Sequence, residues 1–169
     1  IHVKETDMGI SLALSAYTPD DLQILIAGEA EQDAPSAQSK CDLDKLWYEL
    51  HYLLTQSYDP KGSLLSNALY LPHNPLDDAD LDEAEKVAIM ESVVAEMGWS
   101  PVAYLLEEEV AAIATELGRQ DFEELWENTY TELDNDDDDK EWLREAFLKL
   151  RAFYRNAADN RNGVLGMLY

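Results

Sequence analysis

The segment from Asp42 to Thr55 has the clearest hydrophobic periodicity in the chain and constrains its fold more than any other stretch. Its apolar residues recur at steps of three and four, which is the spacing of one buried face of an α-helix. They are Leu43, Leu46, Trp47, Leu50, Leu53 and Leu54. Asp42 or Asp44 can cap the start of such a helix by accepting free backbone N–H groups. We therefore predict a helix over residues 42–55, with Trp47 and Leu50 in the core.

A second line of side chains runs beside this apolar face. It contains Asp44, Tyr48, His51 and Thr55, with Trp47 at the boundary. Polar groups in such a place either satisfy one another or line a pocket, and both interpretations are open here. The pKa of an ordinary histidine lies near neutrality, so His51 is a candidate general base. No partner nucleophile is evident, because we expect Cys41 on the far side of the helix start. We therefore assign no catalytic residue.

Composition narrows the class of protein. At 169 residues the chain fits one domain that buries about two thirds of its unfolded surface. Its net charge of -24 repels nucleic acid and anionic membranes and attracts basic partners. The single cysteine excludes an internal disulfide and indicates a reducing compartment. No apolar run reaches the length of a membrane span, so we expect a cytoplasmic protein with no membrane partner and no direct nucleic-acid binding.

The remaining elements predict an α+β fold. Alternating apolar residues from Ile10 to Ala16 and the apolar run of residues 163–168 predict strands at both ends, with a possible short strand near Val102. Residues 29–40 have no periodicity and predict an exposed loop. Further helices are predicted over 18–28, 63–71, 81–97, 110–118, 121–130 and 143–157. We predict a single domain over residues 8–169, in which a small sheet is covered by a predominantly helical layer.

The first seven residues stand apart from this domain. Ile1 to Asp7 show no pattern and precede a Met-Gly pair that resembles a natural start. We therefore interpret residues 1–7 as a tag or cloning remnant.

The acidic residues are concentrated in one part of the chain. Residues 76–150 hold 24 of the 36 acidic residues and five of the 12 basic ones. Aromatic residues interleave with the carboxylates. Such a surface could bind a basic nucleic-acid-binding protein, because its carboxylates take the place of the phosphates that this protein normally binds. The candidate partner-binding residues are Trp126, Tyr130, Asp134, Asp136, Asp137, Asp138, Asp139 and Trp142. The alternative is that the acidity serves only solubility or adaptation to high salt.

We predict neither a metal site nor a cofactor. Asp134, Asp136, Asp138 and Glu145 fall on positions of a calcium-loop template. The sixth position of that template requires a glycine and is Asp139, so a solvated acidic loop before the last helix fits better. The three histidines are scattered without the spacing of a zinc site.

Four blocks of the chain resemble the YfbM-like bacterial family, catalogued as domain of unknown function 1877. They are Met8-Gly9 with residues 17–22, the motif of residues 44–55, Pro101–Leu105 with residues 109–113, and residues 153–158. The resemblance implies an α+β fold and brings no established reaction. Three departures stand out. The family's Thr-Gly pair is Thr55-Gln56 here, its helix-capping Thr is Leu106, and its Ile-Tyr-Pro loop is residues 135–140.

These observations favour a non-enzymatic acidic binding protein. The expected role is that of an inhibitor or immunity protein that neutralises a basic bacterial toxin or effector, such as a nuclease. The alternative is a small enzyme or ligand-binding module with a pocket near Trp47, Tyr48 and His51. A structural partner in a larger assembly is a third class.

Overall fold

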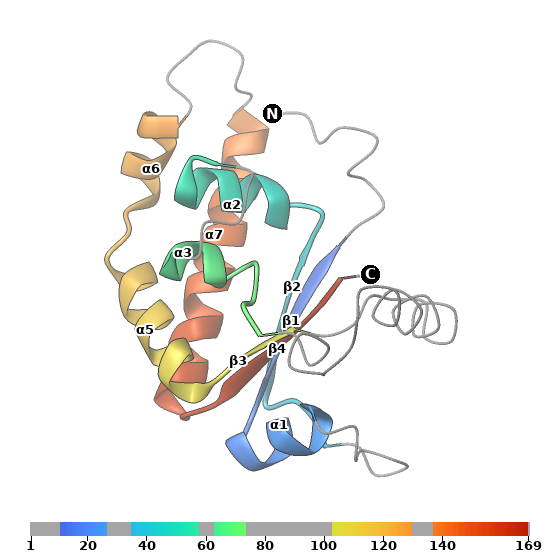
Figure 1. Cartoon of the computed structure of the whole chain (residues 1–169). Helices are drawn as coiled ribbons and strands as arrows, with labels where there is room; N and C mark the ends of the chain where they lie inside the picture. Colours follow the sequence, from blue (N-terminus) through green and yellow to red (C-terminus); the bar gives the residue numbers. More distant parts are fainter. Residues whose placement is uncertain (1–10, 27–34, 58–62, 74–102, 130–136, 169) are drawn as a thin grey trace, which may run out of the picture.

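The computed structural model describes residues 11–26, 35–57, 63–73, 103–129 and 137–168. Its centre is a four-stranded antiparallel sheet in the order β2-β1-β4-β3 (Figure 1). The strands are β1 (Leu12–Tyr17), β2 (Ser39–Asp44), β3 (Ala103–Leu105) and β4 (Gly163–Leu168). The fold is therefore α+β, with the two ends of the described chain paired at the middle of the sheet.

The described helices cover one face of the sheet and one of its ends. They are α1 (Pro19–Ile26), α2 (Trp47–Thr55), α3 (Leu64–Asn67), α5 (Glu107–Gly118), α6 (Phe122–Thr129) and α7 (Asp137–Asp159). Figure 1 shows α2, α3, α5, α6 and α7 on one side of the sheet and α1 at its lower end. The predicted helix over residues 81–97 lies outside the described residues.

Local signals set several of these boundaries. The carboxylate of Asp121 accepts hydrogen bonds from the backbone N–H groups of Glu123 and Glu124 at 2.9 and 3.3 Å, so it caps α6. The predicted terminal strand is confirmed as β4. The strand predicted at the start of the chain is confirmed as β1, but its serine-bearing face is also buried, since Ser11 and Ser15 are only 6% and 5% exposed.

The predicted start of the organising helix was wrong. Residues 39–44 form β2, so residues 39 and 40 are not loop and Leu43 belongs to a strand. Leu14 lies opposite Cys41 in the β1–β2 pair, and this pairing with a distant strand overrides the helical spacing. Asp44 ends the strand with a φ of 50°. The helix α2 begins only at Trp47, and its N-cap residue Leu46 makes no side-chain cap hydrogen bond.

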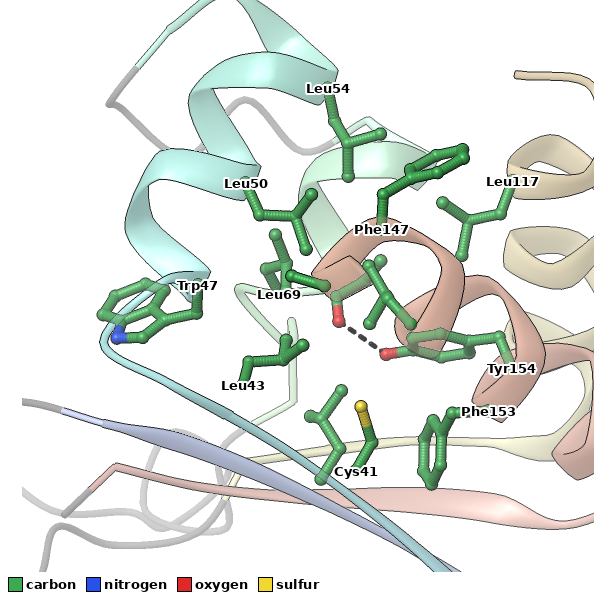
Figure 2. Close-up of a cluster of buried hydrophobic side chains, with 14 of the residues drawn as sticks. Cys41, Leu43, Trp47, Leu50, Leu54, Leu69, Leu117, Phe147, Phe153 and Tyr154 are labelled. Carbon is green, nitrogen blue, oxygen red and sulfur yellow. Dashed lines mark hydrogen bonds between the residues drawn. The ribbon is translucent and has the colours of Figure 1, made fainter. Parts of the chain in front are cut away.

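The core lies between the sheet and α7. The apolar face of α7 contains Phe147, Leu150 and Tyr154, each fully buried. Figure 2 shows Phe147 and Tyr154 with Trp47, Leu50 and Leu54 of α2 to their left and Cys41 of β2 below. The hydroxyl of Tyr154 donates a 2.6 Å hydrogen bond to the carbonyl of Ala68, next to α3 (Figure 2). Trp47 is 7% exposed and Leu50 is fully buried, as predicted.

The end of α2 explains one departure from the resembled family. Gln56 is the C-cap residue, with φ 58° and ψ 29°, and its N–H donates to the carbonyl of Tyr52 at 2.7 Å. This left-handed conformation favours glycine, because a Cβ is strained there. A glycine expected here from the resemblance would have a backbone cause, and this chain has a glutamine in the strained conformation.

We predict that Gln56→Gly stabilises the protein by up to about 1 kcal/mol, since it removes the left-handed strain at a small entropic cost. Chemical denaturation of parent and variant measures the difference. Gln23→Gly in α1 is the matched control and should cost about 0.5–1 kcal/mol, because it places glycine in an ordinary helical turn. A Gln56→Gly variant that loses as much stability as the control contradicts this prediction.

Candidate functional site

His51 is the first residue to test for chemistry, and it is fully buried. Its Nδ1 lies 2.8 Å from the carbonyl oxygen of Ser57, and its Nε2 lies 2.9 Å from the hydroxyl of Ser66. A carbonyl only accepts, so Nδ1 carries the proton, and in the neutral ring Nε2 accepts from Ser66. Burial lowers the pKa of His51, because the charged ring loses its water.

The pair of Ser66 and His51 has the contact of a nucleophile and its base, but no access to substrate. Both residues are 0% exposed. The ring of Tyr70 packs edge-on against His51 with centroids 4.7 Å apart, and Tyr70 packs likewise against Trp47 at 5.3 Å. This pair therefore joins α2 to α3 as a buried hydrogen bond, and the described structure gives it no reacting role.

Of the remaining motif residues, Thr55 lies beside His51, whereas Tyr48 and Asp44 do not. The hydroxyl of Thr55 is 2.8 Å from the carbonyl of His51, as expected of a threonine that bonds back along its own helix. Tyr48 is half-buried beside Trp47, with ring centroids 5.7 Å apart. Asp44 is on β2 rather than on the helix, and its Oδ1 accepts a 2.9 Å hydrogen bond from Ser11. The predicted helical line therefore does not include Asp44.

Asp44 instead meets a residue from the other end of the chain. Trp142, in the second turn of α7, is 56% exposed. It lines a hollow of about 400 Å³ between α7 and the end of β2 with the residues that follow it. We call this the Trp142 hollow. Its lining residues are Asp42, Leu43, Asp44, Leu46, Trp142, Glu145, Ala146 and Lys149.

The Trp142 hollow is acidic at its rim and apolar at its floor. Asp42, Asp44 and Glu145 are exposed, whereas Leu43 and Ala146 are buried. Lys149 is the one basic residue in the lining, and its ammonium donates to the carbonyl of Asp42 at 2.9 Å. Three carboxylates around an exposed indole provide both charge and a π face for a cation. This arrangement suits the side chain of a lysine or arginine.

The other predicted partner-binding residues lie in different places. Trp126 is 8% exposed and packs against Phe122 with centroids 6.1 Å apart, so it serves the core. The ammonium of Lys140 lies 5.8 Å from the centroid of its ring. Asp137, Asp138 and Asp139 form the first turn of α7, and Asp139 is half-buried. The other three predicted residues, Tyr130, Asp134 and Asp136, lie outside the described residues.

Nothing in the sequence indicates that two of the lining residues, Asp42 and Lys149, lie near Trp142. Asp42 is predicted as a helix cap, and Lys149 is only one polar position of a long helix. The hydrogen bond between them spans 107 positions of sequence, so no local pattern brings them together. Their meeting depends on the contact between β2 and α7.

Neither a metal-binding cluster nor a membrane-spanning helix is found in the described part of the chain. It holds no group of three or more His, Cys, Asp or Glu side chains placed to bind a metal ion. Asp134 and Asp136 of the calcium template are not among those residues. None of the described helices combines the length and the apolar character needed to cross a membrane.

Comparisons with known proteins agree on the fold and are silent on activity. Residues 8–167 match the model of a family described as a domain of unknown function, DUF1877. No curated protein matches the chain. Its fold is similar to that of YfbM from Escherichia coli, a protein of unknown function, with a TM-score of 0.58 and 19% identity. That likeness covers 94% of this chain and 99% of YfbM.

The burial of His51 generates a prediction about pH. Because the pKa of His51 is lowered in the folded state, the unfolded chain takes up a proton more readily than the folded one below a pH of about 6.5. The contribution of the neutral His51 to the free energy of unfolding is therefore fully present above that pH, and it is lost as the pH is lowered through it. The free energy of unfolding of the parent should fall more steeply than that of His51→Gln, by at most about 1.4 kcal/mol per pH unit.

Denaturation of both proteins between pH 5 and 7.5 measures this difference. An NMR titration of the parent gives an independent check, since the ring of His51 should titrate below its ordinary value. A titration midpoint at or above about 6.5 contradicts the neutral, buried assignment.

Proposed function

We propose that this chain, which belongs to the family of the domain of unknown function DUF1877, is a non-enzymatic protein that binds a basic segment of a partner protein. The single observation that carries the proposal is the exposed indole of Trp142 in a hollow rimmed by Asp42, Asp44 and Glu145. An exposed tryptophan is a frequent centre of binding energy, and carboxylates around it select a cationic partner.

The charge of the whole molecule supports the same partner. A net charge of -24 attracts a basic protein from a distance and speeds its encounter. The first turn of α7 adds Asp137, Asp138 and Asp139 close in sequence to Trp142. A basic toxin or effector, such as a nuclease, has the chemistry that this surface fits. We accordingly propose an inhibitor or immunity role in the cytoplasm.

The enzyme alternative has less support. It depends on a pocket near Trp47, Tyr48 and His51, yet Trp47 and His51 are buried and both ring nitrogens of His51 are hydrogen-bonded. A catalytic base needs to reach the proton that it removes. Among the described residues, those that line the Trp142 hollow include no histidine, cysteine or serine, which supports binding over reaction.

The first test captures the partner from the native host with the parent protein as bait and then measures its affinity for variants. Trp142→Ala should weaken binding at least tenfold, because it removes the aromatic anchor. Leu64→Ala is the matched control, since Leu64 is an exposed apolar residue of α3, 40% exposed and outside the hollow. Equal losses in both variants, or capture of a partner that is not basic, contradict the proposal.

Replacing Asp136, Asp137, Asp138 and Asp139 with asparagine tests the steering by charge. Association should slow severalfold at low salt, and high salt should shrink the difference from the parent. Three of these residues form the first turn of α7, where negative charge is favourable. The variant should therefore lose up to about 1 kcal/mol of stability rather than gain any. Stopped-flow measurements of the association rates of parent and variant at two salt concentrations test this prediction. Equal association rates at low salt would show that these residues do not steer the partner.

A further inference from the structure

A second surface lies between α5 and α7, which run side by side (Figure 1). A groove of about 770 Å³ has small residues along its floor, among them Ala111, Gly118 and Ala152. A second hollow of about 490 Å³ shares Leu148 and Arg151 with it. We call the two hollows together the arginine groove. Its arginines are Arg119, Arg144, Arg151 and Arg155.

This groove concentrates positive charge on a very acidic chain. The chain has 36 acidic and 12 basic residues, and four of its five arginines line this one groove. At the Arg119 end, the nearby acids already have partners. Glu116 pairs with Arg119 at 3.3 Å, and Glu123 pairs with Lys140 at 2.8 Å. Asp121, also in the lining, caps α6, and Asp159 is the one acidic residue at the other end.

Two of the arginines have no partner among the residues that the structure describes. Within the described residues, Arg144 and Arg155 form neither an ion pair nor a hydrogen bond, and both are exposed. Arg151 lies between them and is held in place, because its guanidinium is 5.1 Å from the centroid of Phe147 and donates to the carbonyl of Gln120 at 3.4 Å. Each guanidinium retains donors for a carboxylate.

These arginines form a regular stripe with an apolar centre. Arg144, Leu148, Arg151 and Arg155 follow steps of four, three and four along α7, so they share one face of the helix. Leu148 is 42% exposed in the middle of this face. From Arg144 to Arg155 the stripe spans eleven steps along the helix, or about 16 Å, which equals about three turns of another helix.

We propose that the arginine groove binds an acidic amphipathic helix of a partner protein. Three carboxylates of that helix would pair with Arg144, Arg151 and Arg155, and its apolar side chains would cover Leu148 and the alanine floor. Small floor residues allow a third helix to approach α5 and α7 closely. A nucleic acid fits less well, because its phosphates continue past the groove onto a chain of net charge -24.

This site is independent of the proposed function. The residues of α7 that line the Trp142 hollow are at 142, 145, 146 and 149. The arginine groove is lined by a different set of α7 residues, which includes those at 144, 148, 151, 152 and 155. The helical period places the two sets on either side of the buried face of α7. Variants of one surface therefore leave the other intact.

The test uses two labelled synthetic helical peptides, each of about four turns and built on alanine and leucine. One carries three glutamates at the spacing of Arg144, Arg151 and Arg155, and the other carries lysines in their place. Fluorescence anisotropy should show that the parent binds the glutamate peptide and that Arg144→Glu or Arg155→Glu weakens it at least tenfold. Lys40→Glu, the same charge change at an exposed position of β2, should change the affinity less than twofold.

A charge swap completes the experiment. The double variant with Arg144→Glu and Arg155→Glu should lose the glutamate peptide and gain the lysine peptide. Both positions are exposed, so an unchanged melting temperature should accompany the change of partner. The proposal is overturned if all variants bind the glutamate peptide equally. It is also overturned if the parent prefers a single-stranded oligonucleotide, or if sedimentation shows that the groove instead joins two copies of the chain.

Discussion

Burial of the apolar face of α7 is the constraint on which the rest of the structure depends. Through Phe147, Leu150 and Tyr154 this helix contacts the sheet on one side and the shorter helices on the other. The hydroxyl of Tyr154 is fully buried and donates to the carbonyl of Ala68 at 2.6 Å. Leaving such a group unpaired costs about 1–3 kcal/mol, so this bond fixes how α3 sits over α7. Burial also raises the pKa of Tyr154 well above its ordinary value, so the hydroxyl remains a donor.

With one face of α7 committed to the core, its two flanks carry opposite chemistry. The flank toward β2 exposes Trp142 among carboxylates, and the flank toward α5 exposes Leu148 among arginines. In contrast, His51 is the residue that first suggests catalysis, but it is buried. Its hydrogen bond to the buried Ser66 links α2 to α3. Exposed apolar side chains beside exposed charged groups are typical of interaction surfaces, and a buried satisfied histidine is typical of a core. This contrast supports the binding role that we propose.

Much of this fold could be predicted from local patterns. The apolar spacing of α7, the aspartate cap of α6 and the alternation in β1 each predict their element without distant partners. β2 could not be predicted in this way, because Leu43 continues the three-and-four spacing of Leu46 and Trp47 while its pairing with β1 is long-range. The same limit applies to the site. Trp142 and Asp44 are each recognisable in the sequence, but their meeting across the β2–α7 contact is a property of the folded chain.

The most direct measurement of the binding role is hydrogen–deuterium exchange of this protein with and without its captured basic partner. The partner should slow exchange in peptides that cover residues 42–46 of the β2–α2 junction, together with those from the first turns of α7. Peptides from α1, far from the hollow, should exchange at the same rate in both samples. If protection is absent from the β2–α2 junction while the complex is formed, the Trp142 hollow is not the binding surface.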